Sequence, residues 1–591
     1  MVQSPDTSPE NAPATTAASH NLILVGAGAF ATAGKPAQSD NDTHPILACV
    51  EGISLWGGVD PQTSQIIDAH HPDHGAFLAG CIVMMPTSRG SCSGSSVLLQ
   101  LALNDKAPAA LIFHQDEDIL TLGALVAEQI FDTAIPVFRL CPEDYAALAH
   151  AGQASVGANR IMAGDLDIAF DPLSLDGMTL SNRDQKMRDG ADGSAMAIAM
   201  DIICRIAAVQ GAKNLRDVTR GHIDGCILAN PANLVFAEKM VAMGARIGIP
   251  TTTNAISVDL CNWPQQGVEQ DFGDAASRLA NSYVAMGAQP TFTCAPYLLE
   301  SAPIIGEAIG WSESNAVIYA NSVLGAHSTK LPDFLDLFVA MTGRAPQSGV
   351  YSAEGRRPAR IIDVQLPPGG YDESIWPLLG WAVGSLSPDR IPLVRGLQDS
   401  PLSTDDLKGM CAAFGTTSGA PMLHIAGHTP DAMAPPASDA DVIQINRAAL
   451  ARAWHQLNSA ATDIDLVAIG SPHSSLAELQ QMAALLDGRT CRPGLDVIVT
   501  VGRAVMAEAE RDGTAALLAA ARVRIIQDIC WCSITEPVFP PSARVLMTNS
   551  GKYAHYADGL SGRKVRFGGL AACIDAAITG HASSEPPAWA G

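Results

Sequence analysis

A loop of small hydroxyl residues is the first stretch whose residue types could do chemistry. It reads Pro86-Thr-Ser-Arg-Gly-Ser-Cys-Ser-Gly-Ser-Ser96. Arg89 supplies a planar, permanently charged guanidinium that suits a carboxylate or a phosphate. Between a strand and a helix, the backbone N–H groups of such a loop favour a bound anion. The alternative is a serine-rich turn that only caps the helix.

Cysteine side chains form the second group of candidates. Cys294 precedes an Ala-Pro turn, and Cys530 and Cys532 are separated by one residue. On a strand, the last two would share one face. Metal sites more often have two intervening residues, and a lone cysteine is usually a buried thiol. The spacing therefore permits a metal site without requiring one.

Two further patterns resemble ligand sites but have simpler explanations. Residues 22–34 contain a glycine run similar to a dinucleotide fingerprint, but no clear βαβ unit follows it. We therefore favour a strand that ends in a loose glycine turn. The stretch His70-His-Pro-Asp-His74 could ligate a metal. We interpret it as an exposed polar turn, the commoner explanation for such a group.

Composition limits the class of protein. The chain has 591 residues, of which 47% are hydrophobic, so it can form several domains with sizeable cores. A net charge of −24 argues against non-specific nucleic-acid binding. No apolar run reaches the ~20 residues of a membrane span. Thirteen cysteines, an odd number, favour a reducing compartment, and we predict a cytoplasmic protein with free or metal-binding thiols.

The elements that must position these residues follow an α/β pattern. Residues 81–85 are predicted to form a strand before the hydroxyl loop, and residues 97–103 a helix after it. Residues 466–469 read as a buried strand that feeds a second serine-rich loop and a helix. Polar residues 312–315 precede an apolar helix and predict a capped N-terminus.

Alternating helical and strand-like pieces indicate α/β domains throughout. Residues 1–20 are polar, lack a secretory signal and are predicted to be a disordered tail. We predict a small domain over residues 21–165 and a large part over residues 178–580. The linker falls near residues 161–177, and the large part divides into subdomains 178–345 and 376–580.

Several of these stretches, in this order, resemble aconitase X, a branch of the aconitase superfamily. The resemblance covers about residues 20–580. It rests on the hydroxyl loop and on the segments 55–68, 107–113, 291–297, 311–322, 547–556 and 565–575. It implies a small swivelling β/α domain fused N-terminally to a large, multi-subdomain, aconitase-like α/β part.

The resemblance also implies roles for individual residues. Ser91 would be the catalytic base, with Arg89 and the loop N–H groups stabilising its alkoxide, because a free serine is a poor base. Iron, in an iron–sulfur cluster or as a mononuclear centre, would act as a Lewis acid held by Cys294 and Cys530. The third ligand stays open between Cys261, Cys532 and a non-cysteine group at Ser471, where some relatives carry a cysteine. The implied substrate contacts are Gly225, Cys226, Asn254, Ser314, Asn315 and Lys552. For Lys552, an exposed loop lysine is the alternative.

The implied activity is that of a hydro-lyase acting on a small hydroxy acid. Single-chain bacterial members of this family dehydrate cis-3-hydroxy-L-proline to 1-pyrroline-2-carboxylate, whereas two-chain archaeal members dehydrate mevalonate 5-phosphate. The fusion and the few cationic loop residues favour the first reaction. The alternatives are another hydroxy acid, such as mevalonate 5-phosphate, or a catalytically silent relative that binds a small acid or an iron cluster. The departure at Ser471 favours the silent relative, and the sequence leaves the oligomeric state open.

Overall fold

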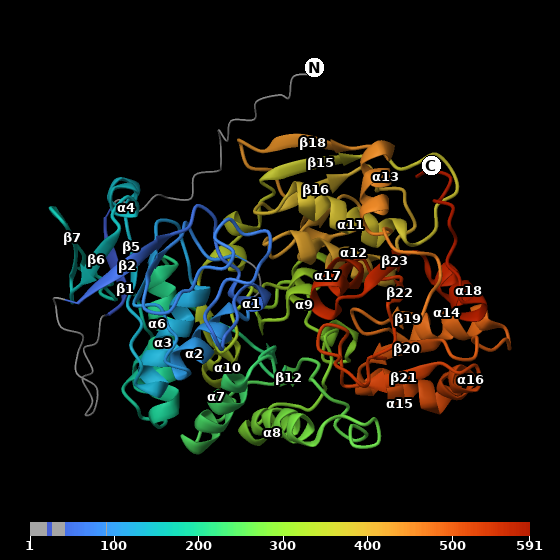
Figure 1. Cartoon of the computed structure of the whole chain (residues 1–591), viewed down its shortest axis with the longest axis horizontal. Helices are drawn as coiled ribbons and strands as arrows, with labels where there is room; N and C mark the ends of the chain where they lie inside the picture. The colour runs from blue at the N-terminus through green and yellow to red at the C-terminus, as the bar shows by residue number, and fades with distance from the viewer. Residues whose placement is uncertain (1–19, 27–41, 90–91, 591) are drawn as a thin grey trace. The chain divides into compact units, whose positions relative to one another are not determined.

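The computed structural model describes residues 20–26, 42–89 and 92–590. Most of the predicted N-terminal tail, the glycine run after Gly26 and Ser91 therefore lie outside the described residues. The chain divides into two compact units (Figure 1). The first comprises Met1–Met178 with Cys204–Ala212, and the second comprises Thr179–Ile203 with Lys213–Gly591.

The first unit is built on a nine-stranded sheet in the order β8-β7-β6-β2-β3-β4-β5-β1-β9. Its central strands are parallel: β2 (Thr43–Ala48), β3 (Ile82–Met84), β4 (Ala110–Phe113) and β5 (Val137–Arg139). The flanking strands are β1 (Leu22–Val25), β6 (Gln153–Val156), β7 (Arg160–Ala163), β8 (Leu166–Ala169) and β9 (Asp171–Pro172). Because the central strands are parallel, the loops that follow β2 and β3 leave the sheet at the same edge.

The helices of the first unit are α1 (Leu55–Gly58), α2 (Gly94–Leu103), α3 (Ile119–Phe131) and α4 (Pro142–Ala149). The predicted strand before the hydroxyl loop and the predicted helix after it are both confirmed, and the helix begins three residues earlier than expected. α2 and α3 approach closely, since a Cβ at Gly123 would lie 2.8 Å from the carbonyl oxygen of Ser95. The stretch interpreted as a linker contains β8 and β9, which pair within the sheet.

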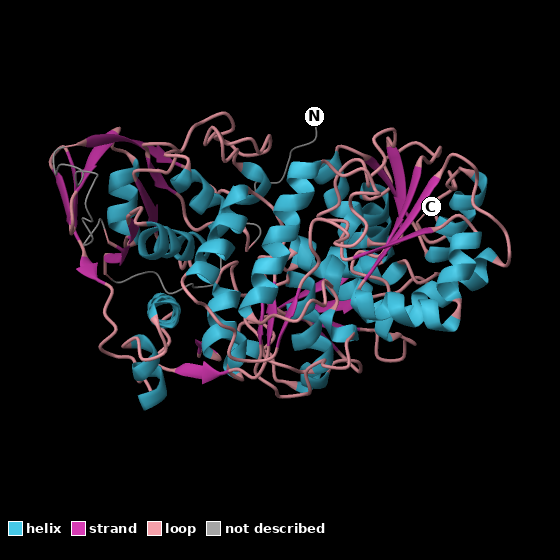
Figure 2. Cartoon of the chain, turned by 90° about the horizontal axis from the view of Figure 1, so that it is seen from below, coloured by secondary structure: helices cyan, strands magenta, loops and turns pink. Residues whose placement is uncertain are grey.

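Separate short sheets form the second unit, with helices making up much of the remainder (Figure 2). A three-stranded parallel sheet contains β11 (Gly221–Ile223), β12 (Thr251–Thr253) and β13 (Gly310–Trp311). A four-stranded parallel sheet contains β15 (Arg360–Val364), β16 (Pro392–Arg395), β17 (His424–Ile425) and β18 (Asp441–Ile445). β10 (Leu215–Asp217) and β14 (Arg344–Pro346) form an antiparallel pair.

A five-stranded parallel sheet has the order β21-β20-β19-β22-β23. Its strands are β19 (Leu466–Ile469), β20 (Asp496–Val501), β21 (Arg524–Gln527), β22 (Val545–Thr548) and β23 (Lys564–Phe567). α14 (Leu476–Leu486), α15 (Arg503–Asp512), α16 (Thr514–Ala520) and α18 (Leu570–Thr579) surround it in Figure 1 and share its apolar core. Ile256, after β12, pairs with Ile529, after β21, so this bridge joins the loops of two sheets.

Six of the remaining helices contribute residues to a second, larger apolar core: α8 (Gln270–Met286), α9 (Ser314–Tyr319), α11 (Ile375–Leu386), α12 (Thr404–Thr417), α13 (Arg447–Gln456) and α17 (Gly551–Ser561). The second unit also contains α5 (Asn182–Arg188), α7 (Pro231–Ala242) and α10 (Leu335–Thr342). α6 (Ser194–Val209) contributes residues to both units. Within the described residues, no helix is both long and apolar enough to cross a membrane.

Candidate active site

Three cysteine side chains from two distant segments of the second unit lie together. Cys294 and Cys530 pack against Ala255, with Cys532 beside them, and we call these three cysteines the thiol cluster. Cys294 is 1% exposed and Cys530 is 3% exposed. The Cys-Trp-Cys segment forms a turn after β21, not the strand considered from sequence, and the N–H of Ser533 donates to the carbonyl of Cys530. The turn, and not strand alternation, therefore brings Cys530 and Cys532 together.

The thiol cluster stabilises one thiolate at its centre. Hydrogen bonds from Cys294 and Cys532 hold the pKa of Cys530 well below its usual value, and the ammonium of Lys552 lowers it further. Burial raises the pKa of Cys294, and the hydrogen bond to Cys530 raises that of Cys532. Such a set of sulfur donors suits iron or an iron–sulfur cluster.

Lys552 is a buried member of the site. It lies in the first turn of α17, not in a loop, and its Nζ is 2.7 Å from Oε1 of Glu313. The two side chains are 10% and 8% exposed, so the alternative of an exposed loop lysine is wrong. Burial alone would lower the pKa of Lys552. The carboxylate of Glu313 and the three cysteines outweigh this effect and raise that pKa well above its usual value.

The start of α9 connects this ion pair to the cysteine loop. Glu313 caps the helix by accepting the N–H of Ala316 at 2.8 Å. Asn315 Nδ2 donates to Glu313 and to the carbonyl of Cys294, and its Oδ1 accepts from the hydroxyl of Tyr297 at 2.8 Å. The predicted capped N-terminus is therefore present, with a carboxylate as the cap. Ser314 is the half-buried first residue of α9.

An acidic cluster adjoins the ion pair, and it consists of Asp224, Glu313, Asp333 and Asp336. The backbone N–H groups of Asp224 and Gly225 donate to Oδ2 of Asp336 at 2.8 and 3.4 Å. Burial, followed by the charges of Asp333, Glu313 and Asp336, raises the pKa of Asp224 well above its usual value. Burial and Asp333 raise the pKa of Asp336 to about 7.

Three of the substrate contacts expected from sequence lie at this acidic cluster. Asn254, just after β12, donates its Nδ2 to Asp224 Oδ1. Gly225 and Cys226 follow Asp224 in the loop after β11, and the Cys226 thiol is directed to the carbonyl oxygens of Ile223 and Asn254. Asp224 itself was missed, although it belongs to the stretch that leads directly into the predicted contacts Gly225 and Cys226. Nothing in the sequence linked Asp333 and Asp336 to that stretch.

His473 holds the serine-rich loop after β19 against the thiol cluster. The backbone N–H of His473 donates to Cys294 Sγ at 3.3 Å, and the His473 ring contacts the hydroxyl of Thr293 at 3.2 Å and the carbonyl of Ile529 at 2.8 Å. Ser471, two residues earlier, is buried, and its hydroxyl makes no hydrogen bond within the described residues. Cys532, and not Ser471, is the third group of the thiol cluster, through its hydrogen bond to Cys530.

Two other sequence candidates lie outside these clusters. Cys261 is exposed and is not a member of the thiol cluster. In the first unit, the guanidinium of Arg89 bonds Glu51 at 3.0 Å and Asp68 at 3.1 Å while 42% of its side chain stays exposed. Its backbone N–H donates to the carbonyl of Ile53, which fixes the start of the hydroxyl loop.

Comparison with known proteins identifies the same family along most of the chain. Residues 33–163 match the aconitase X swivel domain, 177–354 its first domain, 358–455 its second and 464–579 its third.

Characterised relatives agree with this match. The cis-3-hydroxy-L-proline dehydratase of Hypocrea jecorina is 46% identical, over 92% of this chain and 95% of that protein. The enzyme of the same name from Pseudomonas aeruginosa is 45% identical, over 92% and 96%. The phosphomevalonate dehydratase large subunit of Methanothermobacter thermautotrophicus is 31% identical, over 65% and 94%. The holo-form crystal structure of Thermococcus kodakaraensis aconitase X superposes with a TM-score of 0.62 at 28% identity, over 68% of this chain and all of that one.

Proposed function

The chain belongs to the aconitase X family and is a dehydratase, and we propose that it converts cis-3-hydroxy-L-proline to 1-pyrroline-2-carboxylate and water. Identities of 45–46% to two enzymes with that activity, over 92% of this chain, support the substrate. The fusion of the swivel domain to the other three domains in a single chain agrees with it.

The acidic cluster is the observation that carries the choice of substrate. Glu313 already neutralises Lys552, and Asp224 adjoins Glu313, Asp333 and Asp336. A phosphorylated substrate would bring about two more negative charges to this cluster. Hydroxyproline instead carries a ring ammonium, which buried carboxylates stabilise. The charge distribution therefore favours an amino acid over mevalonate 5-phosphate.

The reaction removes the proton from Cα and the hydroxyl from C3. The electron pair of the Cα–H bond forms the Cα=C3 double bond, and the resulting enamine tautomerises to the cyclic imine. We assign the Cα proton to Ser91, whose support is its place in the family's active-site loop, with Arg89 as its neighbour. Asp224 is a buried carboxyl group beside Glu313, and burial raises its pKa well above the usual value; Asn254 and Asn315 supply amide groups for orienting the substrate.

Iron, bound by Cys294, Cys530 and Cys532, would supply a Lewis acid for the departing hydroxyl. Its form as a cluster or a mononuclear centre stays open. The hydrogen bonds of Cys294 and Cys532 to Cys530 support these ligands over a set that includes Ser471. The backbone N–H of His473 and the ammonium of Lys552 offset the negative charge of the thiolates.

The test is turnover by anaerobically purified, iron-loaded protein, following the cyclic imine formed from cis-3-hydroxy-L-proline and, in parallel, the unsaturated acid formed from mevalonate 5-phosphate. We expect product from the first substrate only. Ser91→Ala should abolish turnover while iron stays bound. Cys530→Ser and Cys532→Ser should lose iron, whereas Cys261→Ser, an exposed cysteine outside the cluster, should keep both iron and activity. Iron-loaded wild type that dehydrates neither compound would overturn the proposal and favour a silent binder.

A further inference from the structure

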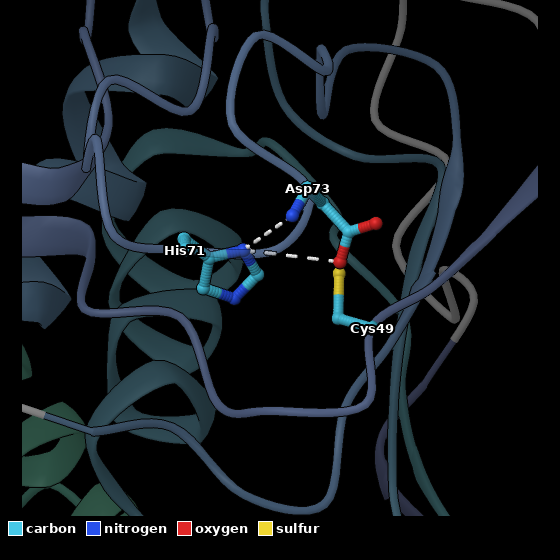
Figure 3. A group of neighbouring side chains, drawn as sticks. All are labelled: Cys49, His71 and Asp73. Carbon is cyan, nitrogen blue, oxygen red and sulfur yellow. Dashed lines mark hydrogen bonds and ion pairs between the residues drawn. The ribbon is translucent and has the colours of Figure 1, made fainter. Parts of the chain in front are cut away.

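A second group of metal-binding side chains lies in the first unit (Figure 3). Cys49, His71 and Asp73 each direct one ligand atom toward a common point, and these atoms all lie within 4.8 Å of one another. Nδ1 of His71 is 3.8 Å from Oδ2 of Asp73. The His71 side chain is fully buried and that of Asp73 is 29% exposed. We call these three residues the Cys-His-Asp group.

The backbone fixes all three side chains. Cys49 directly follows β2, and its N–H donates to the carbonyl of Met84 on the neighbouring strand at 2.8 Å. His71 is held by its N–H to the carbonyl of Asp68 at 3.1 Å, and its own carbonyl accepts the N–H of His74 at 3.0 Å. The spacing of His71 and Asp73 therefore belongs to a tight turn and does not depend on mobile side chains.

Hydrogen bonds leave the Cys-His-Asp group incompletely satisfied. Nε2 of His71 is buried and makes no hydrogen bond within the described residues, whereas the carboxylate of Asp73 is hydrogen-bonded to the thiol of Cys49. Nδ1 of His71 accepts the N–H of Asp73 at 3.1 Å, so this nitrogen is unprotonated and its lone pair faces Asp73 (Figure 3). An unprotonated ring nitrogen is the form of histidine that binds metals.

Charge favours a divalent cation at the Cys-His-Asp group. Burial and the neighbouring carboxylate of Asp73 raise the pKa of the Cys49 thiol, so an isolated thiolate is unstable there. The two charges of a divalent cation would balance one thiolate and one carboxylate, and the thiol proton would leave to bulk water as the ion binds. Sulfur, imidazole nitrogen and carboxylate oxygen are together typical of zinc. Tetrahedral zinc places its ligand atoms about 3.5 Å apart, close to the distance between His71 and Asp73.

We propose that Cys49 Sγ, His71 Nδ1 and Asp73 Oδ2 bind a zinc ion, with water in the fourth position. The bond from His71 Nδ1 to the ion replaces the hydrogen bond that Nδ1 accepts from the N–H of Asp73. The three ligand atoms need only a small movement toward one another. Asp73, with 29% of its side chain exposed, is the ligand through which the ion would meet solvent.

The proposed ion would position Arg89. Glu51 lies two residues after Cys49, and Asp68 lies three residues before His71. Arg89 bonds both carboxylates, so zinc would tie together the two segments that hold this guanidinium. This consequence, unlike metal binding itself, rests on the proposed function, in which Arg89 is the neighbour of the base.

Cobalt binding to the full chain tests the site. The chain carries Cys294→Ser, Cys530→Ser and Cys532→Ser, so that the thiol cluster cannot bind the probe. In this background we expect one equivalent of Co²⁺, with a thiolate-to-cobalt charge-transfer band that Zn²⁺ abolishes by displacement. Because the readout is metal binding without turnover, its failure is distinguishable from failure of the proposed function.

Three variants complete the experiment. Cys49→Ser should abolish the band, and Asp73→Asn, at a half-exposed position that does not endanger folding, should weaken Co²⁺ binding at least tenfold. Cys81→Ser, a partly buried thiol of the same unit outside the group, should leave the band unchanged. Circular dichroism checks that each variant is folded. Failure of the background chain to bind Co²⁺, or a band that persists in Cys49→Ser, would overturn the proposal.

Discussion

Replacing Lys552 with methionine tests whether a buried ion pair supports the active site. The variant keeps the length of the side chain but leaves the carboxylate of Glu313 without its cation. At 2.7 Å, two unit charges interact by about 6 kcal/mol for an effective dielectric constant of about 20. Hydrogen bonds from Ala316 and Asn315 still support the carboxylate. We therefore expect the free energy of unfolding of the second unit to fall by about 3–4 kcal/mol.

Two further variants separate the ion pair from other effects. Lys552→Met combined with Glu313→Gln removes the unpaired charge but keeps an acceptor for Ala316. It should cost less than Lys552→Met alone. Lys564 and Asp558 form a control pair with the same 2.7 Å separation, but both side chains are 60% exposed. Lys564→Met should cost less than about 1 kcal/mol.

Urea unfolding of metal-free, reduced protein provides the assay. Trp531 lies between two cysteines of the thiol cluster and packs on Tyr553, with ring centroids 5.0 Å apart, so its fluorescence reports on this region. A loss in Lys552→Met no larger than that in Lys564→Met would refute a buried, charged Lys552. The explanation by an unpaired Glu313 charge would also fail if the double variant were less stable than Lys552→Met alone.

Two other predictions concern the acidic cluster and the loop before Ser471. The pKa of Asp336 is raised to about 7 in the folded protein, so its stabilising contribution is full below about pH 4 and falls as the pH rises to about 7, by at most about 4 kcal/mol. Asp336→Asn keeps an acceptor for the N–H of Asp224. The thermal midpoint of this variant minus that of wild type should therefore be more positive at pH 8 than at pH 5. An equal difference at both pH values would contradict this. Gly470 has φ +96°, and a Cβ there would lie 2.3 Å from the carbonyl oxygen of Thr500, whereas Gly488, at φ +72°, faces open space. Gly488→Ala should cost about 1 kcal/mol for backbone strain and Gly470→Ala about 1–3 kcal/mol more, measured from thermal midpoints, and equal midpoints would disprove the close contact.

The sequence predicted the features that depend on neighbouring residues. Hydrophobic patterning identified the strand and the helix on either side of the hydroxyl loop and the polar start of α9. The order of the motifs indicated the aconitase X family and its α/β architecture, which the comparisons confirm. These features were readable because local periodicity and short motifs carry their own signal along the chain.

Contacts between distant segments required the tertiary structure. Cys294 meets Cys530 and Cys532 because loops from two parallel sheets are joined at Ile256 and Ile529, a pairing that no local pattern encodes. Lys552 meets Glu313 across 239 positions for a similar reason. The acidic cluster likewise assembles carboxyl groups that look like ordinary surface residues in the sequence.

The five residues from His70 to His74 show both what sequence predicts and what only the tertiary structure decides. Its polar composition predicted an exposed turn, and His70 and His74 are exposed. The prediction is wrong for His71, which is buried. Sequence by itself determined that these residues form a polar turn, because that depends on composition. Only the tertiary structure decided that His71 and Asp73 meet Cys49, because β2 brings this cysteine from more than twenty positions earlier.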